Sequence, residues 1–222
     1  MADQQPTDLP PPWFSRISEG ASSTVLAAHF DGRHPDGSMH DHPGPVDAVL
    51  SDPSVAAWVR FVAPGGHVRV LEVKIDGRTP YGQLTGTVEL CYLVVGEPTA
   101  SPPAVQLIAF SGAAPDGTVL GREEARRLGL RTQDQVAAVR WFPGSGVVHQ
   151  VYVSPEWRRR KVASKLLTVA ELLSVAHGWQ PLHGSGERTE LGEELVTRAS
   201  GYWRSRVVAQ TTVMPPMTPG EA

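Results

Sequence analysis

Four consecutive cationic side chains, from Arg158 to Lys161, stand between an apolar segment and a segment whose apolar residues have helical spacing. This spacing places them at the N-terminus of a helix, where free backbone N–H groups and the positive end of the helix dipole favour an anion. Cations are locally unfavourable there, and Lys161 and Lys165 form a like-charged pair one turn apart. A bound polyphosphate would relieve both penalties. A solvated basic turn without a ligand explains the charges equally well, so both interpretations stay open.

Two regular elements position this basic turn. Val147 to Val153 is rich in β-branched residues and predicts a buried strand, which Pro155 ends because proline has no N–H for a sheet ladder. Apolar residues from Val162 to Ala176 recur at helical spacing and predict a long amphipathic helix, with Gly178 as its C-terminal cap. Pro143 to Gly146 predicts a hairpin turn into the strand. The basic residues are therefore expected in a strand–turn–helix unit.

This unit resembles motif A of the GNAT superfamily of N-acetyltransferases. Arg158 matches the Gln/Arg that opens the superfamily's fingerprint and Ala163 matches the Gly/Ala that closes it, whereas Lys161 stands where the family has glycine. Arg160 to Ala163 is also similar to the Arg-Lys-Lys-Ile-Ala of cohesin acetyltransferases, a branch of the same superfamily. The resemblance covers Gln135 to Val213 and implies that acetyl-CoA is the co-substrate. In the family, backbone amides of this turn bind the cofactor's pyrophosphate.

The resemblance also assigns residues to the cofactor and to catalysis. The cofactor-binding set is Val151, Tyr152, Val153, Arg158, Arg159, Arg160, Lys161, Val162, Ala163 and Ser164. A backbone N–H of Val153 or Tyr152 would stabilise the oxygen of the thioester that the amine attacks.

A general base would help this attack, because a lysine-like amine has a pKa near 10.4 and is rarely neutral at physiological pH. His149 is the first candidate, since period-two counting places it on the same strand face as the valines at 151 and 153. A histidine that is merely hydrogen-bonded at a strand end fits the pattern as well. Glu187 is the second candidate, in a loop where cohesin acetyltransferases carry an acidic residue. Many family members use a tyrosine in the later helix as the general acid that protonates the leaving thiolate. Thr197 stands at that position here, so this general acid is missing.

The whole chain predicts an α/β architecture of the α+β type. We expect a GNAT-like mixed, mainly antiparallel central sheet flanked by helices, with an elaborated N-terminal region. Predicted strands lie at Ser23–Phe30, Val68–Ile75, Thr87–Val95, Val105–Phe110 and Gln135–Phe142, with a very short edge strand at Trp179–His183 and closing strands within Tyr202–Val213. Further helices are predicted at Pro53–Val62, Arg122–Leu128 and, capped by Thr189, Glu190–Ala199.

Four segments follow from this pattern. Residues 1–14 and 214–222 are expected to be disordered tails, and residues 15–130 the N-terminal part of the fold or a substrate-side elaboration. Residues 131–213 would form the GNAT-like acyl-CoA-binding core.

Composition narrows the possible functions. With 222 residues, 41% of them hydrophobic, the chain can bury a sizeable core, and its net charge of −3 gives no general attraction for nucleic acid. Cys91 is the only cysteine, which excludes an internal disulfide and a multi-cysteine metal site. The His- and Asp-containing loop from Asp31 to Pro43 matches no metal fingerprint, so no metal is expected. Without a signal peptide or membrane-length span, a soluble cytoplasmic protein is expected.

Three classes of function remain. The first is an acetyl-CoA-dependent N-acetyltransferase whose amine acceptor, a small molecule or a protein, is not identified. The second is a catalytically silent GNAT-like module that binds CoA or a protein. The third is a nucleic-acid-binding module, which a run of four cations without interleaved aromatics supports poorly. We expect the first, with no nucleic acid or membrane partner; the sequence does not indicate an oligomeric state.

Overall fold

The computed structural model describes residues 10–20, 22–79, 81–199 and 201–214. Across these residues the chain forms two main sheets with mostly antiparallel strands, and five α-helices. The mixed α+β architecture expected from the sequence is confirmed. None of the helices in this part of the chain is long and apolar enough to cross a membrane.

The N-terminal sheet has five strands in the order β3-β1-β2-β4-β5, and only its β1–β3 pair is parallel. The strands are β1 (Trp13–Glu19), β2 (Ser23–His29), β3 (Met39–Asp41), β4 (Val55–Val62) and β5 (Arg69–Ile75). One face packs against the short helix α1 (Val46–Leu50) through Ile17, Val25 and Val49. The other face packs into the main core of the molecule.

Two predictions for this region are wrong. The stretch from Pro53 to Val62 contains strand β4 instead of a helix. Its apolar residues fit a helical spacing, but it is rich in β-branched and aromatic residues, and β2 and β5 supply hydrogen bonds along both of its edges. The expected tail at residues 1–14 is also too long, because Trp13 and Phe14 are buried in β1. Residues 1–9 lie outside the described part of the chain.

The central sheet has six strands in the order β10-β8-β9-β11-β12-β13. They are β8 (Cys91–Glu97), β9 (Ala104–Phe110), β10 (Val119–Leu120), β11 (Ala137–Trp141), β12 (Val147–Val153) and β13 (His183–Gly184). The strands from β8 to β12 form an antiparallel series, whereas β12 and β13 are parallel and joined by helix α3 (Val162–His177). Helix α2 (Arg122–Arg127) covers β8 at one end of the sheet's other face. Strand β9 precedes residue 130 and β11 follows it. Because these two strands pair, the central sheet contains strands from both sides of the segment boundary expected at residue 130.

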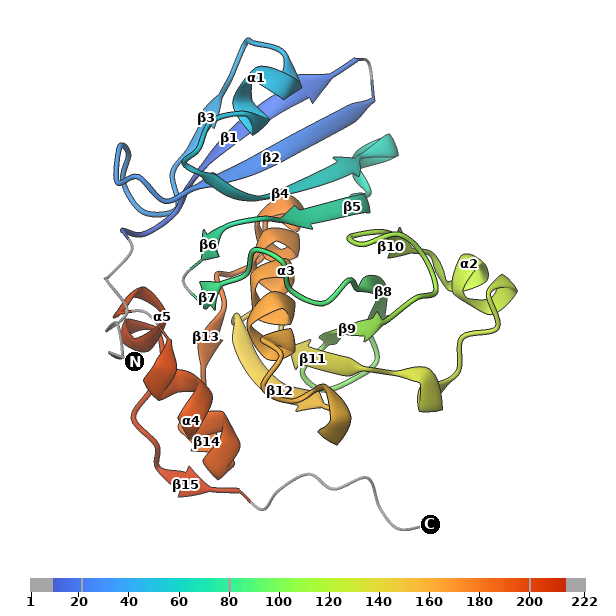
Figure 1. Cartoon of the computed structure of the whole chain (residues 1–222), viewed down its shortest axis with the longest axis vertical. Coiled ribbons are helices and arrows are strands. Elements are labelled where there is room, and N and C mark those ends of the chain that lie inside the picture. Colours follow the sequence, from blue (N-terminus) through green and yellow to red (C-terminus); the bar gives the residue numbers. More distant parts are fainter. Residues whose placement is uncertain (1–9, 21, 80, 200, 215–222) are drawn as a thin grey trace.

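Helix α3 lies between the two sheets (Figure 1). The central sheet covers one side of it, and the N-terminal sheet covers the side that would otherwise face solvent. Leu166, Leu167, Leu172 and Leu173 are each at most 2% exposed, so the helix is buried around most of its circumference. The N-terminal half of the chain is therefore part of the packing that holds the motif helix in place.

The C-terminal segment follows the motif unit. It consists of β14 (Glu187–Arg188), α4 (Glu190–Arg198), α5 (Gly201–Ser205) and β15 (Thr212–Val213), and β14 pairs in parallel with β15. A very short edge strand follows α3 as expected, but it is β13 at His183–Gly184, so only His183 of the predicted Trp179–His183 segment belongs to it. The predicted cap of α4 is confirmed, because the Thr189 side chain accepts a hydrogen bond from the Gly192 N–H at 3.1 Å.

The predicted closing strands within Tyr202–Val213 are largely wrong. Most of this stretch is α5 and irregular chain, and β15 is its one strand among the described residues. Tyr202 and Trp203 are buried, and the Trp203 ring lies 5.0 Å from the ring of Tyr81, in the hairpin of β6 (Arg78–Thr79) and β7 (Gly82–Gln83). Burial of these two neighbouring aromatic residues against α3 and the hairpin favours a helical turn over an exposed strand.

Candidate functional site

Strand β12 is open along most of one edge. It pairs with β13 only at Val147 and Val148, after which the chain beyond β13 leaves and forms hydrogen bonds with Arg206 and Val208 through Gly184. Among the described residues, no strand pairs with positions 149–153 on that side. We call this side the open edge of β12. The backbone groups of β12 that face this side beyond Val148 therefore have no strand partner among the described residues.

The backbone groups that face the open edge can be identified from alternation. The Ser154 N–H donates to the Val136 carbonyl at 3.0 Å, so the N–H of Tyr152 also points toward β11, while those of Val151 and Val153 point toward the open edge. The Arg158 Nε donates to the Val153 carbonyl at 3.1 Å from the same side. Of the two amides predicted to stabilise an oxyanion, Val153 is therefore placed to meet a ligand there and Tyr152 is not.

The turn after β12 has an unusual backbone for its residue types. Arg159 and Lys161 have φ values of 64° and 62°, a left-handed conformation that glycine adopts most readily. Lys161 thus has the conformation suited to glycine, the residue that stands at this position in the motif that the sequence resembles. The N–H groups of residues 159–161 make no hydrogen bond to the described part of the chain, and Val162 begins α3. Consecutive free N–H groups at such a turn form a concavity that binds anions.

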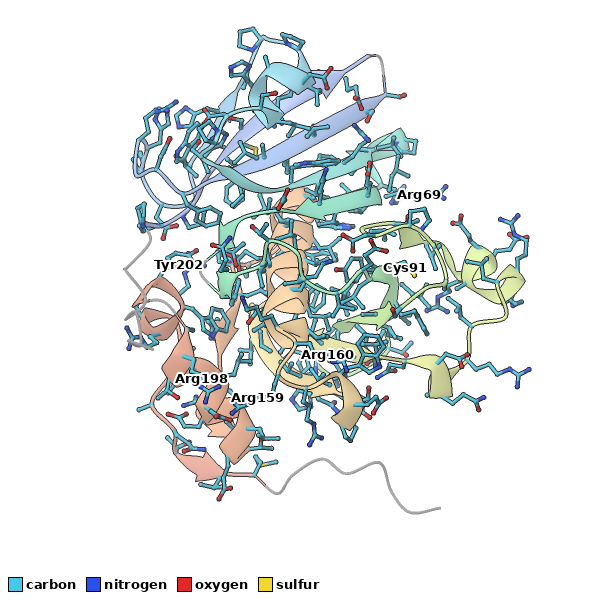
Figure 2. All side chains as sticks on the ribbon, viewed as in Figure 1. Arg69, Cys91, Arg159, Arg160, Arg198 and Tyr202 are labelled. Atoms are coloured by element: carbon cyan, nitrogen blue, oxygen red, sulfur yellow. The ribbon has the colours of Figure 1, made fainter. Side chains whose placement is uncertain are left out.

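Two of the basic side chains in this turn have partners elsewhere in the chain. The Arg159 guanidinium lies 2.7 Å from a carboxylate oxygen of Glu194 in α4, which Arg198 also contacts at 2.6 Å. Figure 2 shows Arg159 and Arg198 close together beside α4. The Lys161 Nζ donates to the Gln83 carbonyl at 2.7 Å, which joins the turn to the β6–β7 hairpin.

The other two basic side chains also have contacts within the unit itself. Arg158 bonds the Val153 carbonyl, and the Arg160 guanidinium lies over the Trp157 ring at 5.3 Å. The repulsion expected from four adjacent cations is therefore partly relieved by the protein, and a bound anion is not required to explain their placement. What remains specific to the turn is its set of free backbone amides.

His149 does not lie on the strand face of Val151 and Val153, where the two-residue period of a strand predicted it. Arg140 of β11 pairs with the residue after His149 and Trp141 pairs with the residue before it, so His149 is the extra residue of a β-bulge. Its exposed side chain lies 5.1 Å from the Phe142 ring, on the face of the sheet away from α3. The bulge breaks the two-residue period, which is why the prediction was wrong. Its role as a base stays a prediction.

The second predicted base and the missing acid both lie in the C-terminal segment. Glu187 is exposed in β14, which pairs with β15 and not with β12. The Thr197 hydroxyl donates to the Glu193 carbonyl of its own helix at 2.8 Å. Neither side chain belongs to the strand that carries the open edge.

The central sheet has a polar hollow on its face away from α3, outside the part that α2 covers. The sequence analysis did not predict this hollow. Its volume is about 160 Å³, and it is lined by Gln106, Gln135, Ala138, Arg140, Gln150 and Tyr152. Arg140 pairs with Glu97 at 2.8 Å. The alternation of Arg140 with the buried Val139 and Trp141 indicates that one face of β11 is polar. This pattern does not indicate which residues of β9 and β12 line the hollow beside it.

A second group of titratable side chains is buried beside α3. The Glu171 carboxylate accepts a hydrogen bond from the Tyr81 hydroxyl and pairs with Arg206, each at 3.2 Å. Arg206 also reaches Asp36 at 3.2 Å. Burial, which outweighs the opposing effect of Arg206, raises the pKa of Glu171 from 4.5 to about 7, and burial also raises the pKa of Tyr81 well above its usual value.

The histidine-containing loop and Cys91 were considered above as possible metal ligands. The described residues contain no group of three or more His, Cys, Asp or Glu side chains arranged to hold a metal ion. In the histidine-containing loop, the rings of His34 and His40 stack at 3.9 Å beside Trp13. Cys91 is buried, and this burial raises the pKa of its thiol.

Comparison with known proteins does not place the chain in a family. No protein-family model, curated protein or solved structure matches it. The fold and the open edge define an α+β protein in which a turn with free backbone N–H groups lies next to a strand edge without a partner among the described residues, and its function has to be proposed from this geometry.

Proposed function

We propose that the chain is an N-acetyltransferase that transfers the acetyl group of acetyl-CoA to an amine. The observation that carries this proposal is the divergence of β12 from β13, directly next to a turn with free amides at the start of α3. The divergence offers an extended path for a pantetheine arm, and the turn offers backbone donors for a diphosphate. A protein that bound only a phosphate would have no need of the open strand edge.

The residues take the following roles in this proposal. The amides of residues 159–161 and of the first turn of α3 hold the diphosphate. The N–H groups of Val151 and Val153 face the arm, and one of them stabilises the thioester oxygen as it gains charge. His149 accepts a proton from the attacking amine. The nitrogen forms a bond to the acetyl carbon, the carbon–sulfur bond breaks, and the thiolate leaves as CoA.

Titration calorimetry with acetyl-CoA tests this function. Arg158→Ala removes the guanidinium that bonds the Val153 carbonyl, and Lys161→Glu places an anion at the turn; each should weaken binding at least about tenfold, equivalent to about 1.4 kcal/mol. Arg126→Ala, a change at an exposed arginine of α2, is the matched control and should bind like the parent. Unchanged affinity in both test variants would remove the support for a cofactor at this turn.

A catalytically silent CoA-binding module is the second candidate. Thr197 stands where many relatives in the resembling family carry an acid, and its hydroxyl is bonded to its own helix. Burial raises the pKa values of Tyr81 and Tyr202, which makes both phenols poor proton donors. Release of free CoA thiol in the presence of a panel of amines separates the two candidates, because a silent module binds acetyl-CoA without turnover.

A further inference from the structure

The polar hollow lies on the same strand as the proposed reaction centre. Tyr152 extends into it from β12, between the two residues whose N–H groups face the open edge. Ala138 lies directly opposite Tyr152 on β11, and its small side chain leaves the floor of the hollow free. A molecule in the hollow is therefore about one strand width from the open edge.

Arg140 offers an unused donor in this hollow. Its Nε and Nη2 atoms donate to Glu97 at 3.0 and 2.8 Å, and the guanidinium lies over the Phe142 ring at 5.2 Å, while its Nη1 donates no hydrogen bond to a described residue. Glu97 is also held by the Gln106 amide, so the guanidinium is fixed in one orientation. A guanidinium with one fixed, free N–H edge favours a carboxylate oxygen.

The bulge brings His149 to the same face. Hydrogen bonds from Arg140, then from Gln106, hold the pKa of Glu97 below its ordinary range, and the charge of His149 adds a smaller effect in the same direction. A donor for a carboxylate and a candidate base for an amine thus share one side of the sheet.

We infer that the hollow binds the acceptor of the proposed reaction, and that this acceptor is a free amino acid held through its carboxylate by Arg140. This inference rests on the proposed function. The hollow of about 160 Å³ is comparable with the volume that takes one benzene-sized ligand, which suits a small amino acid and excludes a folded protein substrate from its floor. An amine without a carboxylate would leave the Nη1 of Arg140 without a hydrogen-bond acceptor.

Two variants separate the acceptor from the cofactor. Ala138→Trp fills the hollow while keeping the Arg140–Glu97 pair, and Arg140→Gln removes the guanidinium. Both are expected to bind acetyl-CoA with the affinity of the parent protein in calorimetry, which also shows that they are folded. Arg126→Gln on α2 is the matched control for the second variant.

The acceptor itself is tested by thiol release from acetyl-CoA with the twenty proteinogenic L-amino acids, 1,5-diaminopentane and a lysine-containing peptide. At least one free amino acid should be acetylated, while 1,5-diaminopentane, which is lysine without its carboxylate, should not. Ala138→Trp should abolish transfer, and Arg140→Gln should raise the KM for the amino acid at least about tenfold with a smaller change in kcat. Equal transfer to 1,5-diaminopentane, or unchanged kinetics in both variants, would overturn the inference.

Binding of the amino acids to the protein without acetyl-CoA is measured in parallel by ligand-detected NMR. Binding that Ala138→Trp abolishes supports the hollow even if no acetyl transfer occurs, in which case the proposed function fails and the site stands. Absence of amino-acid binding in a protein that does acetylate another amine overturns the site and leaves the proposed function standing.

Discussion

At the scale of single residues, the left-handed turn before α3 is the most informative feature. Lys161 holds a conformation that disfavours any side chain with a Cβ atom, and its exposed Nζ contact with the Gln83 carbonyl gives little stability in return. A strained residue that the fold nevertheless maintains indicates a local requirement for that backbone shape. Here the shape presents the amides of the turn outward.

Lys161→Gly should therefore stabilise the protein by about 1 kcal/mol, because glycine adopts positive φ without the steric penalty of a Cβ atom. Urea unfolding gives the free energy of unfolding for this comparison. Lys74→Gly, at an exposed position of the regular strand β5, is the control and should lower stability by about 0.5–1 kcal/mol. A loss of stability in Lys161→Gly as large as that in the control would contradict the account of the turn.

At the scale of elements, local sequence signals predicted the strand–turn–helix unit. Features that depend on long-range contacts could not be predicted from them. Val147–Val153, the turn at Pro155 and the helix capped by Gly178 follow from β-branched residues, proline and helical spacing, which act within a few residues. The apolar residues of Pro53–Val62 fit both a helical and a strand period, and pairing with β2 and β5 makes this segment a strand. The bulge at His149 depends on the register with β11, which one strand's sequence does not contain.

The site follows the same division. The position of the basic turn was predictable because it lies between two recognisable elements. The partners of its side chains, Gln83 and Glu194, come from segments 78 and 35 residues away, and no local pattern indicates them. The lining of the hollow comes from three strands and from Gln135 before β11, and it was missed for the same reason.

The cap of α4 gives a prediction at this scale. Thr189→Ala removes the hydrogen bond to the Gly192 N–H and should lower the free energy of unfolding by about 1 kcal/mol, or loosen α4 by that amount if it unfolds separately. Thr189→Ser keeps an equivalent hydroxyl and should stay within a few tenths of a kcal/mol of the parent. Urea unfolding and amide exchange of α4 measure the two effects, and equal stability of the Ala and Ser variants would show that the cap is not made.

At the scale of the whole molecule, two sheets enclose one helix and a few contacts join them directly. Gly117 is one of these points: its carbonyl accepts from the Val73 N–H in β5 at 2.9 Å, and its N–H donates to the Leu90 carbonyl at 2.8 Å. A Cβ atom on Gly117 would lie 1.9 Å from the Val73 carbonyl oxygen. The two sheets can approach this closely only because the residue is glycine.

Gly117→Ala should thus cost more than about 2 kcal/mol of stability, since strain from positive φ is joined by a clash with backbone that has to move. Gly112→Ala also has positive φ, with no atom within 4 Å of the added Cβ, and isolates the conformational part of the loss at about 1 kcal/mol. Thermal unfolding of the pair gives the difference. Equal losses in the two variants would show that the sheets are not joined through this contact.

Glu171 of α3, which contacts Tyr81 and Arg206, should make the free energy of unfolding depend on pH. Its pKa is raised from 4.5 to about 7, so the folded protein binds more protons than the unfolded chain between these values. The stability that this carboxyl contributes is fully present below about pH 4.5 and is lost as pH rises through 7. Glu171→Gln mimics the protonated form and should gain up to about 3 kcal/mol relative to the parent between pH 4.5 and 8. Parallel pH profiles of urea unfolding for the two proteins would contradict this assignment.

Amide hydrogen exchange with and without CoA tests the central claim most directly, because the claim concerns particular backbone N–H groups. On addition of saturating CoA, the amides of Val151, Val153 and residues 159–164 should exchange more slowly, whereas Tyr152, whose N–H faces β11, should be little changed. Binding of CoA with no protection at the open edge and the turn, or no binding at all, would contradict the account.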